Sequence, residues 1–254
     1  MPIDPNTGVY FETHGSGAPL LIAFPIMASH GAVFGVEEAV VRDRFLDHFI
    51  DRYQVLLVDY PSIGKSADIP PSELTADRVC ADLLSAASAA GFNQFAYWGY
   101  SWGAAVGLQL SLRTERLSAL VMGGWPPLGA DYGRILSAAE AQVSNPPKEV
   151  QIVLRSPKQY AQWATFYRSI DGFSEREVSL EKRFPRLAYV GAEGDVGAGA
   201  ELIRNAAIMK ENRETLEAAG WRVVFIEGED HGVGLKPEIV CPIVRSFLDE
   251  NLLS

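Results

Sequence analysis

Short apolar runs alternate with amphipathic helical patterns along the 254 residues of this chain, and no other feature constrains its fold as strongly. Most of the runs are continuous rather than alternating, as expected for strands that are covered on both faces. They predict strands at Val9–Thr13, Leu20–Phe24, Gln54–Tyr60, Phe95–Gly99, Ala119–Gly123, Leu187–Gly191 and Arg222–Glu227. The patterns between them predict helices at Val36–Phe49, Glu73–Ala90, Ala104–Arg113, Ala200–Ala219 and Pro237–Asn251. This order of strand and helix predicts an α/β fold, with a mostly parallel twisted sheet and helices on both faces.

The composition argues against several classes of function. The net charge is −10, and no stretch clusters lysine and arginine with aromatic residues, so we expect no nucleic-acid partner. Cys80 and Cys241 lack C-x-x-C spacing, which indicates free thiols in a reducing, cytoplasmic compartment. We expect neither a signal peptide nor a membrane anchor, because the longest apolar stretch, Pro19–Ala28, is too short to span a bilayer. A monomer or homodimer acting on a small molecule fits these features.

One segment, residues 128–184, interrupts the alternation because it contains no obvious strand. Its central pattern, Pro157–Ile170, predicts an amphipathic helix that carries Trp163 and Tyr167. An aromatic insertion of this length favours a helical lid over a pocket, with residues 1–127 and 185–254 forming the core domain. In the alternative interpretation, the aromatic residues only seal a connecting excursion against the core.

The five residues Gly99-Tyr100-Ser101-Trp102-Gly103 lie between an expected strand and an expected helix. A G-x-S-x-G pattern at such a junction is a nucleophile elbow, a strained turn that raises the serine hydroxyl above the sheet. Glycine two positions before and after the serine lets strand and helix pass closely without Cβ clashes. The pattern therefore predicts that Ser101 is a catalytic nucleophile.

A serine hydroxyl needs a base to take its proton, and the base needs an orienting carboxylate. Asp195 follows the sixth expected strand and His231 follows the last one. Loops at the carboxyl ends of parallel strands are the edge where such sheets place ligands. The order Ser101, Asp195, His231 thus predicts a catalytic triad, with Glu193 as the alternative acid.

In these motifs and their order, the chain resembles the α/β-hydrolase superfamily over nearly its whole length. The stretch Asp59–Ser66 is also similar to a D-x-x-G-x-G-x-S turn of that family, where it is structural. The resemblance implies that the backbone N–H groups of Ile26 and Trp102 form an oxyanion hole. Phe24-Pro25 stands where many relatives carry His-Gly, which argues against the subfamilies that this dipeptide defines.

The expected function is a serine hydrolase that cleaves an ester, lactone or thioester bond through an acyl-enzyme. The aromatic lid favours an apolar substrate. The candidate substrate-binding residues are Met27, Trp125, Trp163 and Tyr167. No metal or organic cofactor is expected, because no cluster of side chains has ligand spacing and no G-x-G-x-x-G motif occurs.

Three alternatives from the sequence stay open. The same residues could serve a cofactor-free lyase or a C–C bond hydrolase, since a fold does not determine the reaction. They could also belong to a ligand receptor that retains a slow triad, or to an acyl-carrier thioesterase, which would need a protein-docking surface.

Overall fold

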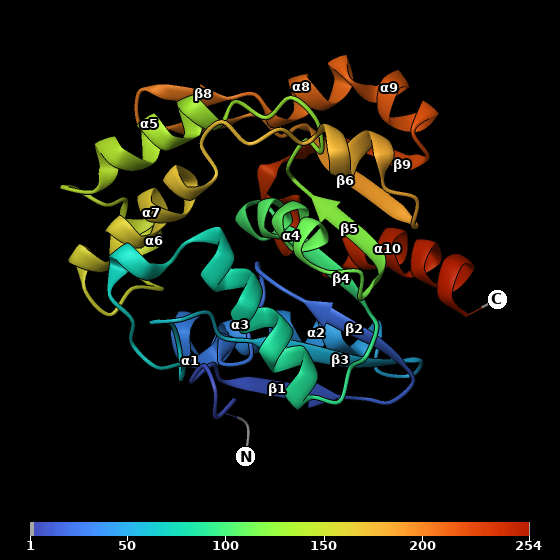
Figure 1. Ribbon diagram of the computed structural model, residues 1–254, viewed down its shortest axis with the longest axis horizontal. Coiled ribbons are helices and arrows are strands. Elements are labelled where there is room, and N and C mark those ends of the chain that lie inside the picture. Colours follow the sequence, from blue (N-terminus) through green and yellow to red (C-terminus); the bar gives the residue numbers. More distant parts are fainter. Residues whose placement is uncertain (1–2, 254) are drawn as a thin grey trace.

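The central sheet has seven strands in the order β1-β3-β2-β4-β5-β6-β9 (Figure 1). The computed structural model describes residues 3–253 of the chain. The strands are β1 (Phe11–His14), β2 (Ala18–Ile22), β3 (Tyr53–Val58), β4 (Phe95–Tyr100), β5 (Leu117–Gly123), β6 (Arg186–Glu193) and β9 (Trp221–Asp230). Strand β1 is antiparallel to β3 at one edge, and the remaining neighbours pair in parallel. Each of the seven strands expected from the sequence overlaps one of these, so the mostly parallel sheet is confirmed.

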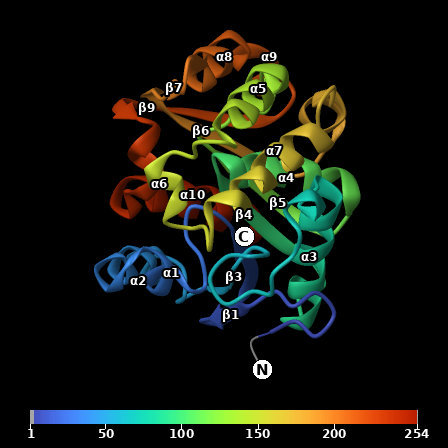
Figure 2. The same cartoon turned by 90° about the vertical axis from the view of Figure 1, so that its left-hand side faces the viewer.

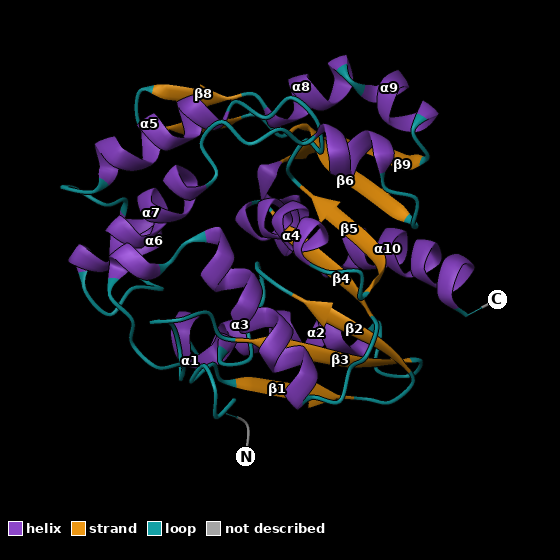
Figure 3. Ribbon diagram, viewed as in Figure 1, coloured by secondary structure: helices purple, strands orange, loops and turns teal. Residues whose placement is uncertain are grey.

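Helices cover both faces of this sheet (Figures 2 and 3). Helices α3 (Ala76–Ala89) and α4 (Trp102–Arg113) contribute buried residues to the core cluster on one face. Helices α2 (Ala39–Asp47) and α10 (Pro237–Leu252) contribute to the cluster on the other face. Within residues 3–253, no helix combines the length and apolar character needed to cross a membrane.

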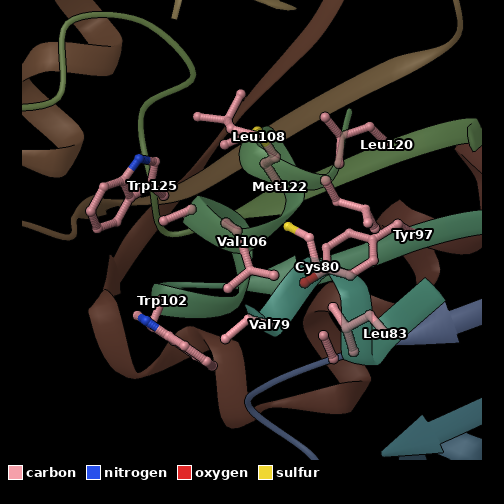
Figure 4. Packing of buried hydrophobic residues seen from close by; sticks show 14 of the residues in the cluster. Val79, Cys80, Leu83, Tyr97, Trp102, Val106, Leu108, Leu120, Met122 and Trp125 are labelled. Carbon is pink, nitrogen blue, oxygen red and sulfur yellow. The ribbon is translucent and has the colours of Figure 1, made fainter. Parts of the chain in front are cut away.

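The continuous apolar runs follow from this two-sided burial. In β4, Tyr97 belongs to the cluster under α3 and α4, whereas Trp98 belongs to the opposite cluster, because successive side chains of a strand point to opposite faces. Figure 4 shows the first cluster, with Trp102 and Trp125 at its edge. The core therefore reaches the loops that follow strands β4 and β5.

The ends of α3 agree with the sequence pattern. The Thr75 side chain accepts a hydrogen bond from the backbone nitrogen of Arg78, which caps the helix N-terminus. Gly91 follows the last turn with φ 79°, a left-handed conformation that glycine adopts at low cost. The helix therefore begins and ends where capping residues allow it.

The segment expected as one helix over Ala200–Ala219 is different in the structure. A short antiparallel hairpin, β7 (Val196–Ala198) and β8 (Glu201–Ile203), precedes two helices, α8 (Asn205–Glu211) and α9 (Arg213–Ala218). Gly199 takes φ 63° in the hairpin turn, a conformation suited to a tight reversal. The hairpin packs against α5 (Tyr132–Gln142), so it extends the insertion side of the molecule.

Residues 128–184 form three α-helices, a 3₁₀ helix at Pro157–Tyr160 and a π-helical turn at Glu177–Glu181. Besides α5, the helices are α6 (Lys148–Gln151) and α7 (Ala161–Ser169), and Figure 1 shows all three together beyond the ends of the central strands. Arg155 donates to the carbonyl oxygens of Gly64 and Ser66, at 2.9 and 2.6 Å, and to the Asp68 carboxylate. These bonds hold the insertion against the loop after β3.

Candidate active site

Ser101 sits in a strained turn between β4 and α4. Its backbone has φ 53° and ψ −118°, and its N–H donates to the Gly123 carbonyl at 2.8 Å. A Cβ on Gly99 would lie 2.2 Å from the Gly103 carbonyl oxygen, and one on Gly103 would lie 2.8 Å from the Phe24 carbonyl oxygen. Both glycines of the elbow are therefore required by close backbone approach.

His231 lies beside this serine. Its Nε2 atom is 3.0 Å from Ser101 Oγ, within the reach of a general base. The residue begins a 3₁₀ turn over His231–Leu235 directly after β9, and the Asp230 carboxylate caps that turn by accepting from the Gly232 N–H at 2.7 Å. The structure thus brings together the predicted nucleophile and the predicted base.

Tyr100 anchors the backbone of the histidine. Its hydroxyl donates to the His231 carbonyl oxygen at 2.7 Å, and the two ring centroids are 5.2 Å apart. A Cβ on Gly234 would lie 2.4 Å from the Tyr100 ring, so the turn that carries the histidine presses on this tyrosine. Because Tyr100 immediately precedes Ser101, one strand end positions both members of the pair.

Burial lowers the pKa of His231 to about 4, and the nearby charge of Asp230 acts weakly in the opposite direction. The imidazole is therefore neutral at pH 7 and can accept a proton from the serine. The other ring nitrogen, Nδ1, is buried and has no hydrogen-bond partner within residues 3–253.

Asp195 does not hydrogen bond to the Nδ1 atom of His231. Its Oδ1 atom accepts from the backbone nitrogens of Ala206 and Ala207, at 2.9 and 3.1 Å, at the start of α8. The amide groups of a helix N-terminus attract a carboxylate, and here they hold this one. In the described part of the chain, neither Asp195 nor Glu193 hydrogen bonds to His231, so the expected Asp–His contact is not made.

The proposed oxyanion donors have free backbone N–H groups. No hydrogen bond to the nitrogen of Ile26 or Trp102 is made by the residues that the structure describes. The close approach of Phe24 to Gly103 brings the loop that carries Ile26 against the elbow. The Phe24–Pro25 peptide bond is cis. Phe24 approaches Gly103 closely although Phe24-Pro25 stands in place of the His-Gly dipeptide.

Two cavities meet at Ser101. The larger, of about 350 Å³, is lined by Phe24, Pro25, His30, Phe34, Glu38, Ser101, Trp102, Val150, Val153, Tyr160, Trp163, Tyr167 and Leu235. The smaller, of about 170 Å³, is lined by Ser101, Trp125, Ile135, Ala138, Ala139, Gln142, Tyr160, Tyr167, Val196, Ala198, Ile203 and Asn205. Tyr160 and Tyr167 lie in the walls of both, so the serine faces a two-part, largely apolar space.

The predicted pocket residues divide between these walls, with one exception. Trp163 lines the larger cavity, Trp125 lines the smaller one, and Tyr167 lines both. Met27 lines neither, because its side chain is 1% exposed and packs in the core cluster under α3 and α4, which corrects its assignment.

Sequence reasoning missed a large part of the wall, above all His30, Phe34 and Leu235. The first two lie in α1 (His30–Phe34), a helix too short to show a periodic pattern, and Leu235 ends the 3₁₀ turn that begins at His231. Only the His-Gly dipeptide formed by His30 and Gly31 could have drawn attention to this segment. Among the described residues, no group of His, Cys, Asp or Glu is arranged to hold a metal ion.

Comparisons with known proteins agree with this architecture. A family model described as the alpha/beta hydrolase fold matches residues 31–204. RutD of Klebsiella pneumoniae (strain 342), described as a putative carbamate hydrolase, is 32% identical over 126 residues, which cover 49% of this chain and 44% of that protein. The match therefore spans less than half the length of this curated relative.

Two solved structures illustrate the likeness of fold. A thermophilic esterase from Thermogutta terrifontis has a TM-score of 0.71 at 18% identity, over 95% of this chain and 93% of that one. A variant of the N-acyl homoserine lactonase AidH, complexed with N-hexanoyl homoserine, has a TM-score of 0.68 at 16% identity, over 99% and 96% of the two chains.

Proposed function

This chain belongs to the alpha/beta hydrolase family, and from that premise we propose that it is a serine hydrolase of neutral, largely apolar esters. The observation that carries the proposal is the 3.0 Å contact between Ser101 Oγ and His231 Nε2, at the point where two cavities meet. An activated nucleophile with its base inside an apolar space suits acyl transfer.

In the proposed mechanism, Ser101 Oγ attacks the substrate carbonyl while His231 Nε2 takes the hydroxyl proton. The backbone N–H groups of Ile26 and Trp102 stabilise the oxyanion of the tetrahedral intermediate. His231 then protonates the leaving group, which departs and leaves an acyl-serine. A water molecule, deprotonated by the same imidazole, attacks the acyl-serine and frees the acid.

The two cavities suggest where the two groups of an ester substrate bind. The acyl and leaving groups of an ester diverge from its carbonyl carbon, and the space around Ser101 likewise extends in two directions. Of the two, the bulkier apolar group fits the cavity of about 350 Å³ and the smaller group fits the cavity of about 170 Å³. Lactones and carbamates, the bonds named for the lactonase and RutD, belong in the substrate panel with simple esters.

The test compares Ser101→Ala with Ser144→Ala, which changes an exposed serine. Across p-nitrophenyl esters, a lactone and a carbamate, Ser101→Ala should lower kcat by roughly 10⁴–10⁶ with little change in Tm. A fluorophosphonate probe should label the wild type and Ser144→Ala at Ser101, as shown by peptide mass spectrometry.

Labelling at another serine, or full activity in Ser101→Ala, would refute the proposal. Tight binding of esters by a wild type that turns none of them over would favour the receptor alternative. Cleavage of a carbon–carbon bond with the esters left intact would instead favour a C–C bond hydrolase.

A further inference from the structure

A second histidine, distinct from the base, lies in the wall of the larger cavity. His30 begins α1, directly after the loop that carries Ile26, and its side chain shares this cavity with Ser101. The residue is 2% exposed. It is therefore a buried polar group that faces the space where the substrate of the proposed hydrolase binds.

His30 has no polar partner of its own in the protein. Its Nδ1 atom is fully buried without a hydrogen bond, whereas Nε2, which no residue in the described part of the chain bonds to, is not fully buried and is the ring nitrogen that a ligand atom can reach. The ring packs on Phe34, with centroids 4.6 Å apart and planes at 43°. Burying a polar group without a partner is unfavourable, so a ligand atom that pairs with it gains a favourable contact.

His30 is a neutral group at pH 7. Burial, together with the smaller effect of the positive charge on Arg42, lowers its pKa to about 4. Arg42 itself donates to the Ala28 carbonyl, and its guanidinium lies 3.6 Å from the Glu12 carboxylate. The hydrogen bond and the ion pair of Arg42 are therefore made with groups other than His30. A neutral imidazole offers one donor and one acceptor.

The rest of this cavity wall is mainly apolar or aromatic. Glu38 adds an exposed carboxylate, and no lysine or arginine lines the cavity among residues 3–253. An anionic substituent would meet a negative charge there without a compensating cation. An uncharged polar atom can pair with the imidazole or with the indole N–H groups of Trp102 and Trp163, which are also buried without a partner among the described residues.

We infer that His30 is a recognition residue, which hydrogen bonds to one uncharged polar atom, such as a ketone or hydroxyl oxygen, in the larger group of the substrate. The inference rests on the proposed function and narrows its substrate class to esters whose bulky group is apolar except at one position. His30 takes no part in the transfer of protons at the ester bond. It sets which substrate is preferred, as a buried hydrogen-bonding group in a pocket does.

The experiment compares His30→Phe, which keeps an aromatic ring, with His30→Gln, which keeps hydrogen-bonding capacity. Phe34→Leu is the matched control, because it alters the neighbouring ring in the same wall and leaves His30 in place. The substrates are p-nitrophenyl hexanoate and its analogues with a ketone at carbon 3, 4 or 5. For each ester, the kcat/KM of the variant is divided by that of the wild type, and this ratio cancels the differing reactivities of the esters.

For at least one keto ester, His30→Phe should lower kcat/KM about tenfold, the effect of one lost hydrogen bond, while the hexanoate changes little. His30→Gln should restore part of the loss, and Phe34→Leu should affect all the esters alike. Equal effects of His30→Phe on every ester would overturn the inference and reduce His30 to a packing residue.

A binding measurement keeps the inference separate from the proposed chemistry. In Ser101→Ala, ethyl hexanoate and its keto analogues can be titrated by the fluorescence of Trp102 and Trp163, which line the same cavity. Adding His30→Phe should weaken binding of the preferred keto ester about tenfold and leave ethyl hexanoate unchanged. A loss of this kind without any turnover by the wild type would support the recognition role and refute only the hydrolase. Equal binding by both proteins would refute the recognition role.

Discussion

At the scale of single residues, the site is a serine–histidine pair whose histidine is positioned by a tyrosine. The Tyr100 hydroxyl holds the His231 backbone carbonyl at 2.7 Å, while no described carboxylate contacts the buried Nδ1 atom. In a full triad, the carboxylate orients the imidazole and stabilises its protonated form. Here orientation comes from the backbone turn and its contact with the tyrosine ring, and the carboxylate expected at the ring is bonded to a helix instead.

Asp195→Asn tests that difference. Because Asn keeps a side-chain oxygen that can accept from Ala206 and Ala207, the variant loses only the interaction of the charge with the N-terminus of α8, and the free energy of unfolding should fall by about 0.3–1 kcal/mol. The substitution should lower kcat/KM less than about tenfold, in contrast with the roughly 10⁴-fold loss that follows when a triad carboxylate is neutralised. Thermal denaturation and ester kinetics on the same preparation measure both effects. A loss of several orders of magnitude at unchanged Tm would place Asp195 on the histidine during catalysis.

At the scale of elements, the question is whether the insertion shapes the substrate site or only covers the core. Trp163 of α7 lines the larger cavity and packs edge-on against Trp102, with ring centroids 4.9 Å apart. Ile170, just after α7, is 3% exposed, belongs to the core cluster and lines neither cavity. The two positions therefore separate a proposed substrate contact on α7 from a packing contact at the C-terminal end of that helix.

Trp163→Ala should raise KM for a bulky apolar ester about tenfold, which corresponds to roughly 56 Å² of lost apolar contact at about 25 cal/mol per Å². It should leave an acetate ester nearly unaffected, because the small acetyl group of that ester does not reach Trp163. Ile170→Ala should lower Tm and should change kcat/KM by the same factor for both esters. If Trp163→Ala reduced kcat/KM equally for the two esters, the insertion would have only a structural role.

The same scale shows which elements a sequence can reveal. The seven strands of the sheet were predictable because most of them contain a continuous apolar run, and Gly99 and Gly103 marked the elbow through backbone contacts that every such turn needs. Hairpin β7–β8 was not predictable, since three-residue strands carry no period. Its presence after Asp195 brings the N-terminus of α8 to that carboxylate, a contact that spacing along the chain does not encode.

At the scale of the whole molecule, two neutral histidines, His30 buried and His231 partly buried, link stability to pH. His30 and His231 each have a folded pKa of about 4, below the ordinary value of 6.5. The unfolded chain therefore binds protons at a higher pH than the folded one. The stability contributed by these histidines is fully present above about pH 6.5 and is lost as the pH falls toward 4.

His30→Phe isolates one of these contributions, because other titrating groups are common to both proteins. Between pH 7 and pH 4, the free energy of unfolding should fall more steeply in the wild type than in His30→Phe, by roughly 1.4 kcal/mol per unit of pKa shift removed. Urea denaturation at pH 7, 5.5 and 4 gives the two slopes. Parallel slopes would show that His30 titrates normally in the folded protein.

The attachment of the insertion has a consequence for how such a molecule can change. Of the four acceptors that Arg155 and Gln159 use on the loop after β3, three are backbone carbonyls, those of Ser62, Gly64 and Ser66. A carbonyl is present whatever side chain its residue carries, so the loop needs no particular sequence to offer these three bonds. The insertion thus supplies the side chains of its own attachment, and the loop supplies mainly backbone acceptors. The sequence of the insertion could therefore change during evolution without a matching change in the side chains of the loop beneath it.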